Sequence, residues 1–326
     1  MPPALSPRSR SGVVPTVRRL LRTYSFGFAL LVSLALLIAN LLTESGGFGW
    51  TQQMADFAPL GLAAIASTPA IISGGFDFTI SPLIFLTNAV FVIWLLPHGL
   101  GGAISVPIVL ALGAAVGALQ AVLIIVLRIP SVVVTLGLYF ILIGVDYKIA
   151  PNAVSISSSW LTHLSGSVGP IPGALFTLGA PFVIWFALRF IPYRGVMFAV
   201  GSNEATAYST GVNVGLVRIC AYALGGLFAG IGGLALTGLV LSTNSSLSGT
   251  YTLIAIAGVG LGGTSFWGGR GGLLGSMLGA VVIYLLGSLL SALQVDPNWL
   301  QVMYGGMLLV AVVVGGKLAL PAKQAA

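Results

Sequence analysis

Two carboxylates that fall inside long apolar stretches are the residues of this chain best placed to do chemistry. Only six of the 326 residues are acidic, and two of these, Asp77 and Asp146, lie within apolar segments. A carboxylate at the centre of a bilayer costs about 2.5–3.5 kcal/mol on insertion scales, so it must cap a helix or line a polar cavity. Proton relays and sodium sites usually need several such groups, which argues against an ion-coupled carrier.

The other reactive side chains are too scattered for catalysis. The single cysteine, Cys220, begins an apolar run and is expected to be a small buried hydrophobe. His98 and His163 lie in or near predicted loops, so we expect no metal site and no cofactor. No nucleophile triad is visible, no P-loop precedes any lysine, and "HGLGG" at 98–102 lacks a nucleophile elbow. We therefore predict no catalytic residue, and a membrane enzyme is the weakest alternative.

The amino-acid composition indicates a protein that is embedded in a lipid bilayer. Charged residues make up 6% of the chain and hydrophobic residues 57%, with a mean hydropathy of +1.07. Soluble domains carry about 25% charged residues. Long apolar runs favour an all-α integral membrane protein over a barrel, whose strands alternate in short segments. The 45 glycines suit helices packed closely in lipid.

Ten apolar segments follow a basic N-terminal stretch. Residues 1–22 are predicted to be a cytoplasmic tail before an uncleaved anchor, 23–318 the transmembrane domain, and 319–326 a second cytoplasmic tail. Several segments are shorter than the ~20 residues of a full crossing, so some are expected to be broken or re-entrant. The ten segments lie at about 24–43, 57–73, 78–96, 103–127, 131–150, 174–192, 217–240, 251–266, 272–294 and 299–316.

The distribution of positive charge predicts the orientation. With ten crossings and the N-terminus inside, 12 of the 13 basic residues fall on the cytoplasmic side, and only Lys148 does not. The net charge of +7 is then explained by topology, and we expect no nucleic-acid partner. In this arrangement both termini are cytoplasmic, and so is the polar loop at about 194–218.

Two glycine-rich stretches interrupt the apolar pattern. "SGGFDFTISP" (73–82) contains Gly74, Gly75 and Asp77, and is either a capped turn or a broken helix beside a translocation path. The second stretch, 258–280, is either close helix packing or a hinge of that path, and its candidate residues are Gly262, Gly263, Thr264, Gly268, Gly269 and a buried-looking Arg270. The stretches fall in the third and eighth apolar segments, which suggests an internal repeat.

The polar loop has the features of a short helix. Asn203 is a suitable N-cap for a helix beginning at Glu204, whose charge favours the positive helix end. Gly211 can end that helix in the left-handed conformation. The alternative is a solvated connector.

Four motifs in order resemble the permease subunits of carbohydrate-type ABC importers, the branch that serves ribose, galactose and xylose. The resemblance covers about residues 55–316. Its motifs are "GGFDFTIS" (74–81), "IPSVVVTLG" (129–137), "GSNEATAYSTGVNV" (201–214) and "GGTSFWGGRGG" (262–272). Departures occur at Ala205, where the family often has a second acid, and at Tyr208, where a basic residue is common.

The resemblance implies a transport subunit of the bacterial inner membrane with several partners. The 194–218 loop, with Asn203, Glu204, Ala205, Gly211 and Asn213, would be the coupling element that docks on a separate ABC ATPase subunit. A second permease copy or paralogue, an extracytoplasmic sugar-binding protein, membrane lipid and the sugar complete the expected partners. Thr135 is expected on the path, where Asn88, Tyr139 and Trp94 are further candidates. A permease for an autoinducer-like or nucleoside-like solute remains the alternative, followed by an ion-coupled carrier.

Overall fold

The computed structural model describes residues 26–43, 49–157, 159–296 and 298–319, and these residues fold mainly into helices. The predicted tails, 1–22 and all but one residue of 319–326, lie outside these ranges. The helices are α2 (Gly27–Thr43), α3 (Trp50–Ile72), α4 (Ile80–Val90), η1 (Phe91–Leu95), α5 (Gly102–Leu127), α6 (Ser131–Ile149), α7 (Ser159–Ser165), α8 (Ala174–Ala187), η2 (Leu188–Phe190), α9 (Tyr193–Ser202), α10 (Glu204–Ser209), α11 (Val214–Val240), η3 (Ser245–Leu247), α12 (Tyr251–Leu261), α13 (Leu273–Ala292) and α14 (Asn298–Ala319). Two antiparallel strand pairs join β1 (Val154–Ser155) to β4 (Ser242–Thr243) and β2 (Ser167–Val168) to β3 (Ile171–Pro172).

Helices α3 and α11 form the buried centre. Every residue of α3 from Phe57 to Ile72 is buried. A Cβ added at Gly225 of α11 would lie 2.7 Å from the Ala66 oxygen, and one added at Gly232 would lie 3.5 Å from Leu62 Cβ. Residue numbers rise along α11 as they fall along α3, so the two helices are antiparallel.

Glycines spaced four apart bring further helices into backbone contact. On α5, a Cβ added at Gly113 would overlap the Gly226 oxygen, and one at Gly117 would overlap the Tyr222 oxygen, both on α11. On the α12–α13 hairpin, a Cβ at Gly262 would overlap the Gly275 oxygen in the same way. Small residues at this spacing replace the hydrophobic effect as the source of tight association in lipid. Part of the 258–280 glycine run is therefore close packing.

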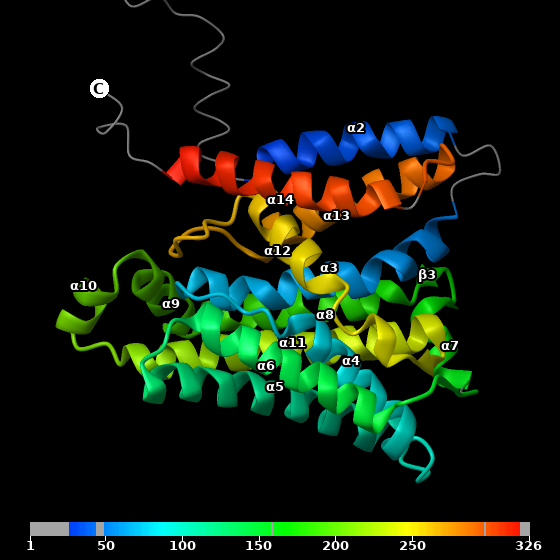
Figure 1. Cartoon of the computed structure of the whole chain (residues 1–326), viewed down its shortest axis with the longest axis horizontal. Helices are drawn as coiled ribbons and strands as arrows, with labels where there is room; N and C mark the ends of the chain where they lie inside the picture. The colour runs from blue at the N-terminus through cyan, green and yellow to red at the C-terminus, as the bar shows by residue number, and fades with distance from the viewer. Residues whose placement is uncertain (1–25, 44–48, 158, 297, 320–326) are drawn as a thin grey trace, which may run out of the picture.

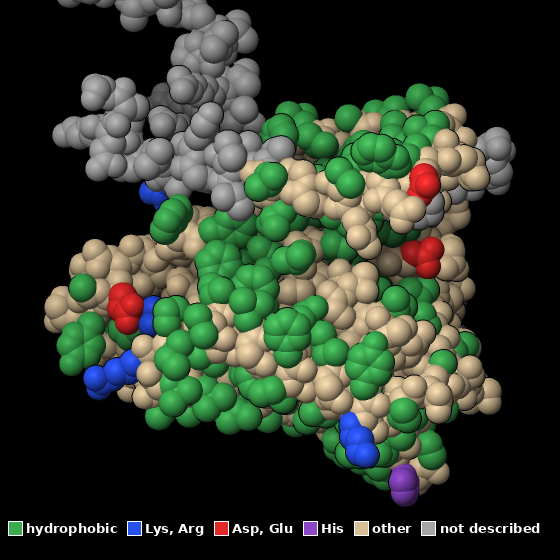
Figure 2. Space-filling view, viewed as in Figure 1, with side chains coloured by type: hydrophobic (Ala, Val, Ile, Leu, Met, Phe, Trp, Pro, Cys, Tyr) green, Lys and Arg blue, Asp and Glu red, His purple; other side chains and the backbone are tan. Residues whose placement is uncertain are grey.

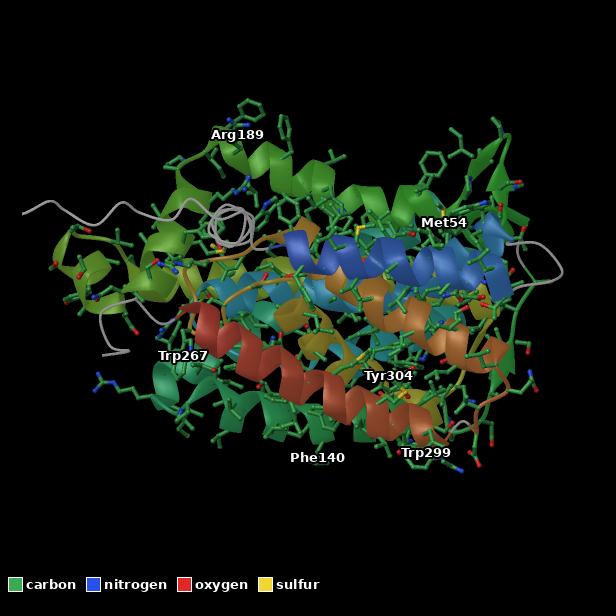
Figure 3. All side chains as sticks on the ribbon, turned by 90° about the horizontal axis from the view of Figure 1, so that it is seen from above. Met54, Phe140, Arg189, Trp267, Trp299 and Tyr304 are labelled. Atoms are coloured by element: carbon green, nitrogen blue, oxygen red, sulfur yellow. The ribbon has the colours of Figure 1, made fainter. Side chains whose placement is uncertain are left out.

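The helices form layers around this centre. Figure 1 shows α5 and α6 along one side of α3, α8 and α11, with α2, α13 and α14 on the opposite side and α12 inclined between them. Figure 3, turned by 90°, shows α2, α13 and α14 running along one another across that upper layer. The most buried elements therefore lie between two outer layers of helices.

Each of the ten predicted apolar segments overlaps a helix, but not all of these helices are long. Within the described residues, five helices are long and apolar enough to cross a membrane, and α8–η2 with α9, bent by 92°, makes a sixth if that pair is one span. Shorter apolar helices cover Gly27–Thr43, Ile80–Leu95 and Tyr251–Leu261. The short helices agree with the expectation of broken or re-entrant segments, and the count of ten crossings stays a prediction.

The loops gather at two ends of the molecule. In Figure 1, α9, α10 and the loop between α12 and α13 lie at one end, whereas α7 and β3 lie at the other. The described arginines sit in or beside the loops at the α10 end, and Lys148 is in the last turn of α6. Figure 2 shows the same separation of Lys and Arg side chains on one face. This separation agrees with the charge argument, and the orientation across a membrane stays a prediction.

A repeated arrangement relates the third and eighth apolar segments. Both α3 and α11 are followed by an irregular segment and then by a helix of 11 residues, α4 or α12. The two short helices meet at their N-termini, where the Tyr251 amide donates to Ser81 Oγ at 3.1 Å and Ser81 Oγ donates to the Ser248 oxygen at 2.7 Å. The segment at 241–250 therefore follows α11 as the break at 73–79 follows α3, and a repeat that relates the two glycine-rich stretches stays a prediction. The 241–250 break is built from Ser, Thr and Asn, so glycine content did not reveal it.

Candidate functional site

Helix α10 is a short capped element that projects from one end of the molecule. Asn203 Oδ1 accepts a hydrogen bond from the Thr206 amide at 3.0 Å, and Gly211 has a φ of +85°, so the predicted cap and left-handed end are both confirmed. Asn213 caps α11 in the same way, accepting from the Leu216 amide at 3.0 Å. Figure 1 shows α10 at one end of the molecule, and all of its residues except Ala207 are exposed.

An ion pair ties α10 to the start of α11. Arg218 Nη2 lies 2.8 Å from Glu204 Oε2. Exposed pairs of this kind contribute about 0–1 kcal/mol, so the pair orients α10 more than it stabilises it. Sequence reasoning did not anticipate this contact, because two residues 14 positions apart on different helices leave no periodic signal.

A groove beside α10 provides a docking surface, which we call the inner groove. It has a volume of about 1080 Å³ and is lined by the end of α5, residues 128–130, α10 and the start of α11. Arg128, Glu204 and Arg218 bring charge to its walls. The Tyr208 side chain also lines it and is 74% exposed. A groove of this size with charged walls suits a polar partner better than hydrocarbon.

Three glycine-containing segments converge under α10, and we call this contact the glycine junction. It consists of Gly74 after α3, Gly201 in α9, and Gly268 and Gly269 in the α12–α13 loop. The Gly269 amide donates to the Ile72 oxygen at 2.9 Å. A Cβ added at Gly201 would overlap the Ile72 oxygen and lie 2.7 Å from the Gly269 amide, and one added at Gly268 would lie 3.0 Å from Gly74 Cα.

The glycine junction brings together residues that the sequence analysis had placed in separate groups. Gly74, Gly268 and Gly269 were candidates for the translocation path, whereas the segment from Gly201 leads into α10. These backbones touch without side chains between them. Because close-packed interiors are hardly compressible, a shift of one segment transmits strain to the others. The glycine junction therefore links α9, which leads into α10, to both the α3–α4 break and the α12–α13 loop.

The break between α3 and α4 is held by hydrogen bonds to a buried carboxylate. Asp77 Oδ1 accepts from the Thr79 amide at 2.9 Å and from Thr79 Oγ1 at 2.6 Å. Asp77 Oδ2 accepts from Gln120 Nε2 of α5 at 2.6 Å. Both carboxylate oxygens thus have donors, as a buried charge requires. Sequence reasoning did not single out Gln120, because a lone amide in an apolar segment gives no sign of its partner.

Residues of α6 and α11 anchor the same break. The Phe76 amide donates to Ser131 Oγ at 3.0 Å, and Tyr222 Oη donates to the Phe76 oxygen at 3.0 Å. Thr135 is buried and donates mainly to the Ser131 oxygen at 2.8 Å. A cavity of about 280 Å³ lies beside Gly74, Gly75 and Tyr222, and it shares Arg218 with the inner groove. The break therefore borders hollow space on the α10 side.

Two buried side-chain oxygens, one on α4 and one on α6, have no hydrogen-bond partner. Asp146 Oδ2 accepts from Ser248 Oγ, while Asp146 Oδ1 is buried without a hydrogen-bond partner. The Oδ1 of Asn88 is likewise buried without a partner, although its Nδ2 donates to Thr237 Oγ1 at 2.8 Å. These oxygens call for donors from water or solute. Within the described residues, no three His, Cys, Asp or Glu side chains gather closely enough to hold a metal ion.

The remaining candidates for the translocation path make no contact described for the glycine junction. Thr264 Oγ1 is buried 3.3 Å from Ser276 Oγ of α13, and Gly262 packs on α13. Gly263 follows α12 with a φ of +79°. The expectation of a buried Arg270 was wrong, since it is exposed in the α12–α13 loop, where a guanidinium stays hydrated. Cys220 is also exposed and not buried as expected, because its face of α11 points away from the core.

Comparison with known proteins identifies the family of this chain. The family described as branched-chain amino acid transport system / permease component matches residues 50–312. That range contains both glycine breaks, α10 and the inner groove. No solved structure matches the chain.

Individual relatives are similar over most of the chain. The ribose import permease protein RbsC of Escherichia coli (strain K12) is 30% identical over 300 residues, covering 89% of this chain and 92% of its own length. The fructose import permease protein FrcC of Rhizobium meliloti is 26% identical over 279 residues, covering 82% and 77%. The galactose/methyl galactoside import permease protein MglC of Escherichia coli (strain K12) is 30% identical over 225 residues, covering 64% and 66%.

Proposed function

The chain belongs to the family described as branched-chain amino acid transport system / permease component, and we propose that it carries a sugar inward across the bacterial inner membrane. In this proposal it contributes the translocation path of an ATP-driven importer and performs no ATP hydrolysis itself. A separate ABC ATPase subunit supplies the energy. A second permease copy or paralogue and an extracytoplasmic binding protein complete the assembly.

The observation that carries the proposal is the contact between α9, which leads directly into α10, and the segments that follow α3 and α12. The ion pair from Glu204 to Arg218 holds α10 against α11, and the glycine junction connects the preceding α9 to the segments after α3 and α12. An element that docks on an ATPase must pass its displacement to the membrane helices. Backbone contacts at Gly201, Gly268 and Gly269 supply a short connection of that kind.

The kind of solute follows from the relatives' names. Relatives over most of the chain import ribose, fructose or galactose. Buried acceptors at Asn88 and Asp146 are suited to solutes rich in hydroxyl donors. In this account Asp77 holds the break beside the path, and Thr135 supports it from α6.

Reconstitution tests the proposal. The chain, its ATPase subunit and its binding protein would be placed in proteoliposomes, and uptake of labelled ribose, fructose and galactose measured. We expect uptake of one sugar that needs ATP inside and persists when ion gradients are collapsed. Uptake that stops with the ion gradient and ignores ATP would overturn the proposal and favour an ion-coupled carrier.

A further inference from the structure

A polar groove lies at the end of the molecule opposite α10, and we call it the outer groove. It has a volume of about 670 Å³ and lies between the end of α2, the first half of α3, α13 and α14. This volume falls within the range of about 300–1,000 Å³ that is typical of small-molecule sites. The polar and aromatic side chains that line it include Gln53, Asp56, Tyr284, Ser291, Gln294 and Tyr304.

Helical spacing places these side chains on faces that point into the groove. Gln53 and Asp56 are three residues apart on α3, and Ser288 and Ser291 are three apart on α13, so each pair shares one face. Hydrocarbon cannot satisfy such faces, because every polar group exposed to lipid loses its hydrogen bonds to water. The groove is therefore suited to water or to a polar solute.

Contacts within the wall hold the polar groups in place before any solute arrives. Tyr284 Oη donates to Gln53 Oε1 at 2.6 Å, and Gln52 Nε2 donates to Asp56 Oδ1 at 2.8 Å. The Tyr284 ring also packs edge-on against Phe57, with centroids 5.6 Å apart. Such pre-organisation lowers the entropy lost on binding.

We propose that the outer groove is a binding site for a neutral monosaccharide on its way into the translocation path. A carboxylate accepts hydrogen bonds from sugar hydroxyls, carboxamides both donate and accept, and tyrosine rings pack against the C–H face of a sugar ring. The described lining residues include one carboxylate and no Lys, Arg or His. A sugar phosphate would meet repulsion there, so the groove selects uncharged sugars.

This inference rests on the proposed function but names a place distinct from the Asp77 break. Gln53 lies in the first turn of α3, and Asp77 follows the last residue of that helix, Ile72, by five positions. The 23 residues of α3 span about 35 Å at 1.5 Å per residue. With the predicted orientation, the outer groove opens on the extracytoplasmic side. A released sugar would therefore reach the outer groove before it reaches the break.

Cysteine protection tests the site directly, because the chain has a single native cysteine. In a Cys220→Ser background, Ser291→Cys places a thiol in the groove, and Gln301→Cys places one on the exposed surface of α14 as the control. A membrane-impermeant maleimide is added to intact cells, with ribose, fructose, galactose or ribose 5-phosphate present. At ten times its dissociation constant, the transported sugar should slow labelling of Ser291→Cys about tenfold and leave Gln301→Cys unchanged.

A filling substitution gives a second test in the full transporter. A Cβ added at Gly287 would lie 3.3 Å from Tyr304 Oη, so Gly287→Leu places a side chain in the groove. Gly305→Leu is the control, since a Cβ there meets nothing within 4 Å. Gly287→Leu should raise the sugar concentration for half-maximal uptake about tenfold or more, the equivalent of one or two lost hydrogen bonds. Its copurification with the ATPase should be normal.

Three results would overturn the proposal. Equal labelling rates of Ser291→Cys with and without the transported sugar would show that the sugar does not bind in the outer groove. If ATP-driven uptake were still observed, the proposed function would stand without this site. Protection by ribose 5-phosphate alone would contradict a neutral ligand. Failure of the unsubstituted protein to take up sugar with ATP would overturn the proposed function, and the assignment of the groove with it.

Discussion

At the scale of single residues, Gly201 is the most tightly constrained position of the glycine junction. Replacing it by alanine adds a methyl group that overlaps the Ile72 oxygen and lies 2.7 Å from the Gly269 amide. We expect Gly201→Ala to lower the free energy of unfolding by about 1–3 kcal/mol, as overpacking does. Thermal unfolding in detergent, followed by size-exclusion chromatography, would measure this loss, and uptake should fall with it.

Gly195→Ala is the matched control on the same helix. A Cβ at Gly195 meets nothing within 4 Å, so this variant should unfold and transport like the original protein. If the two variants behaved alike, the close approach at Gly201 would have no mechanical importance.

The Asp77–Gln120 contact supports a second prediction at this scale. Gln120→Leu leaves Asp77 Oδ2 buried without its donor, which should cost about 1–3 kcal/mol. Asp77→Leu should impair both stability and uptake. The double variant should cost less than the sum of the single variants, since neither partner is left alone. Strictly additive losses in thermal unfolding, with exposed Gln301→Leu as a neutral control, would contradict a shared interaction.

Capping residues could be predicted from the sequence, but their distant partners could not. Asn203 and Gly211 act within a few residues of chain, so their types and spacing indicated the ends of α10 correctly. Gln120 and Arg218 reach Asp77 and Glu204 across different helices. Contacts of this kind depend on tertiary packing and leave no local pattern.

At the scale of elements, α10 is the docking unit in this account. Glu204→Lys removes the ion pair with Arg218 and places a positive charge at a helix N-terminus, which is unfavourable. We expect this variant to reach the membrane at normal levels but to retain several-fold less ATPase on affinity purification.

The control for α10 adds the same charge far from it. Asn152→Lys alters an exposed residue between α6 and β1, beyond the last turn that contains Lys148. It should retain the ATPase normally. Equal ATPase retention by Glu204→Lys and the original protein would count against α10 as the coupling element.

The bounds of helices that consist of one long apolar segment could be predicted from the sequence. The bounds of the breaks between helices were harder to predict. The Gly74–Gly75 pair revealed the break after α3, because paired glycines disfavour helix. The matching break after α11 is formed by polar residues, including Ser245 and Ser248, that bond to Asp146. Its polar composition resembles an ordinary loop, so glycine content gave no sign of this break.

At the scale of the whole molecule, the predicted orientation places α10 in the cytoplasm and the outer groove outside. In a Cys220→Ser background, Ser209→Cys on α10 should react with an impermeant maleimide only after the membrane is permeabilised. Gln294→Cys, which lines the outer groove, should react in intact cells. The opposite pattern would invert the topology and place the inner groove on the wrong side for an ATPase.

Composition and charge were sufficient to predict a helical membrane protein. Burying a charge in lipid is costly in any membrane segment, so every such segment is depleted of charged residues. The convergence of Gly74, Gly201 and Gly268 was not predictable. Those residues are far apart in the chain, and only the packing of α3, α9 and the α12–α13 loop brings them together.

Photo-crosslinking at Tyr208 shows whether α10 docks on an ATPase. A benzophenone amino acid at this exposed position of α10 would be irradiated in native membranes, and its adducts identified by mass spectrometry. Phe140, which is 69% exposed on α6, provides the control position. We expect an adduct with a P-loop ATPase from position 208 and none from position 140. Sugar uptake that continues without any ATPase adduct at position 208 would contradict it.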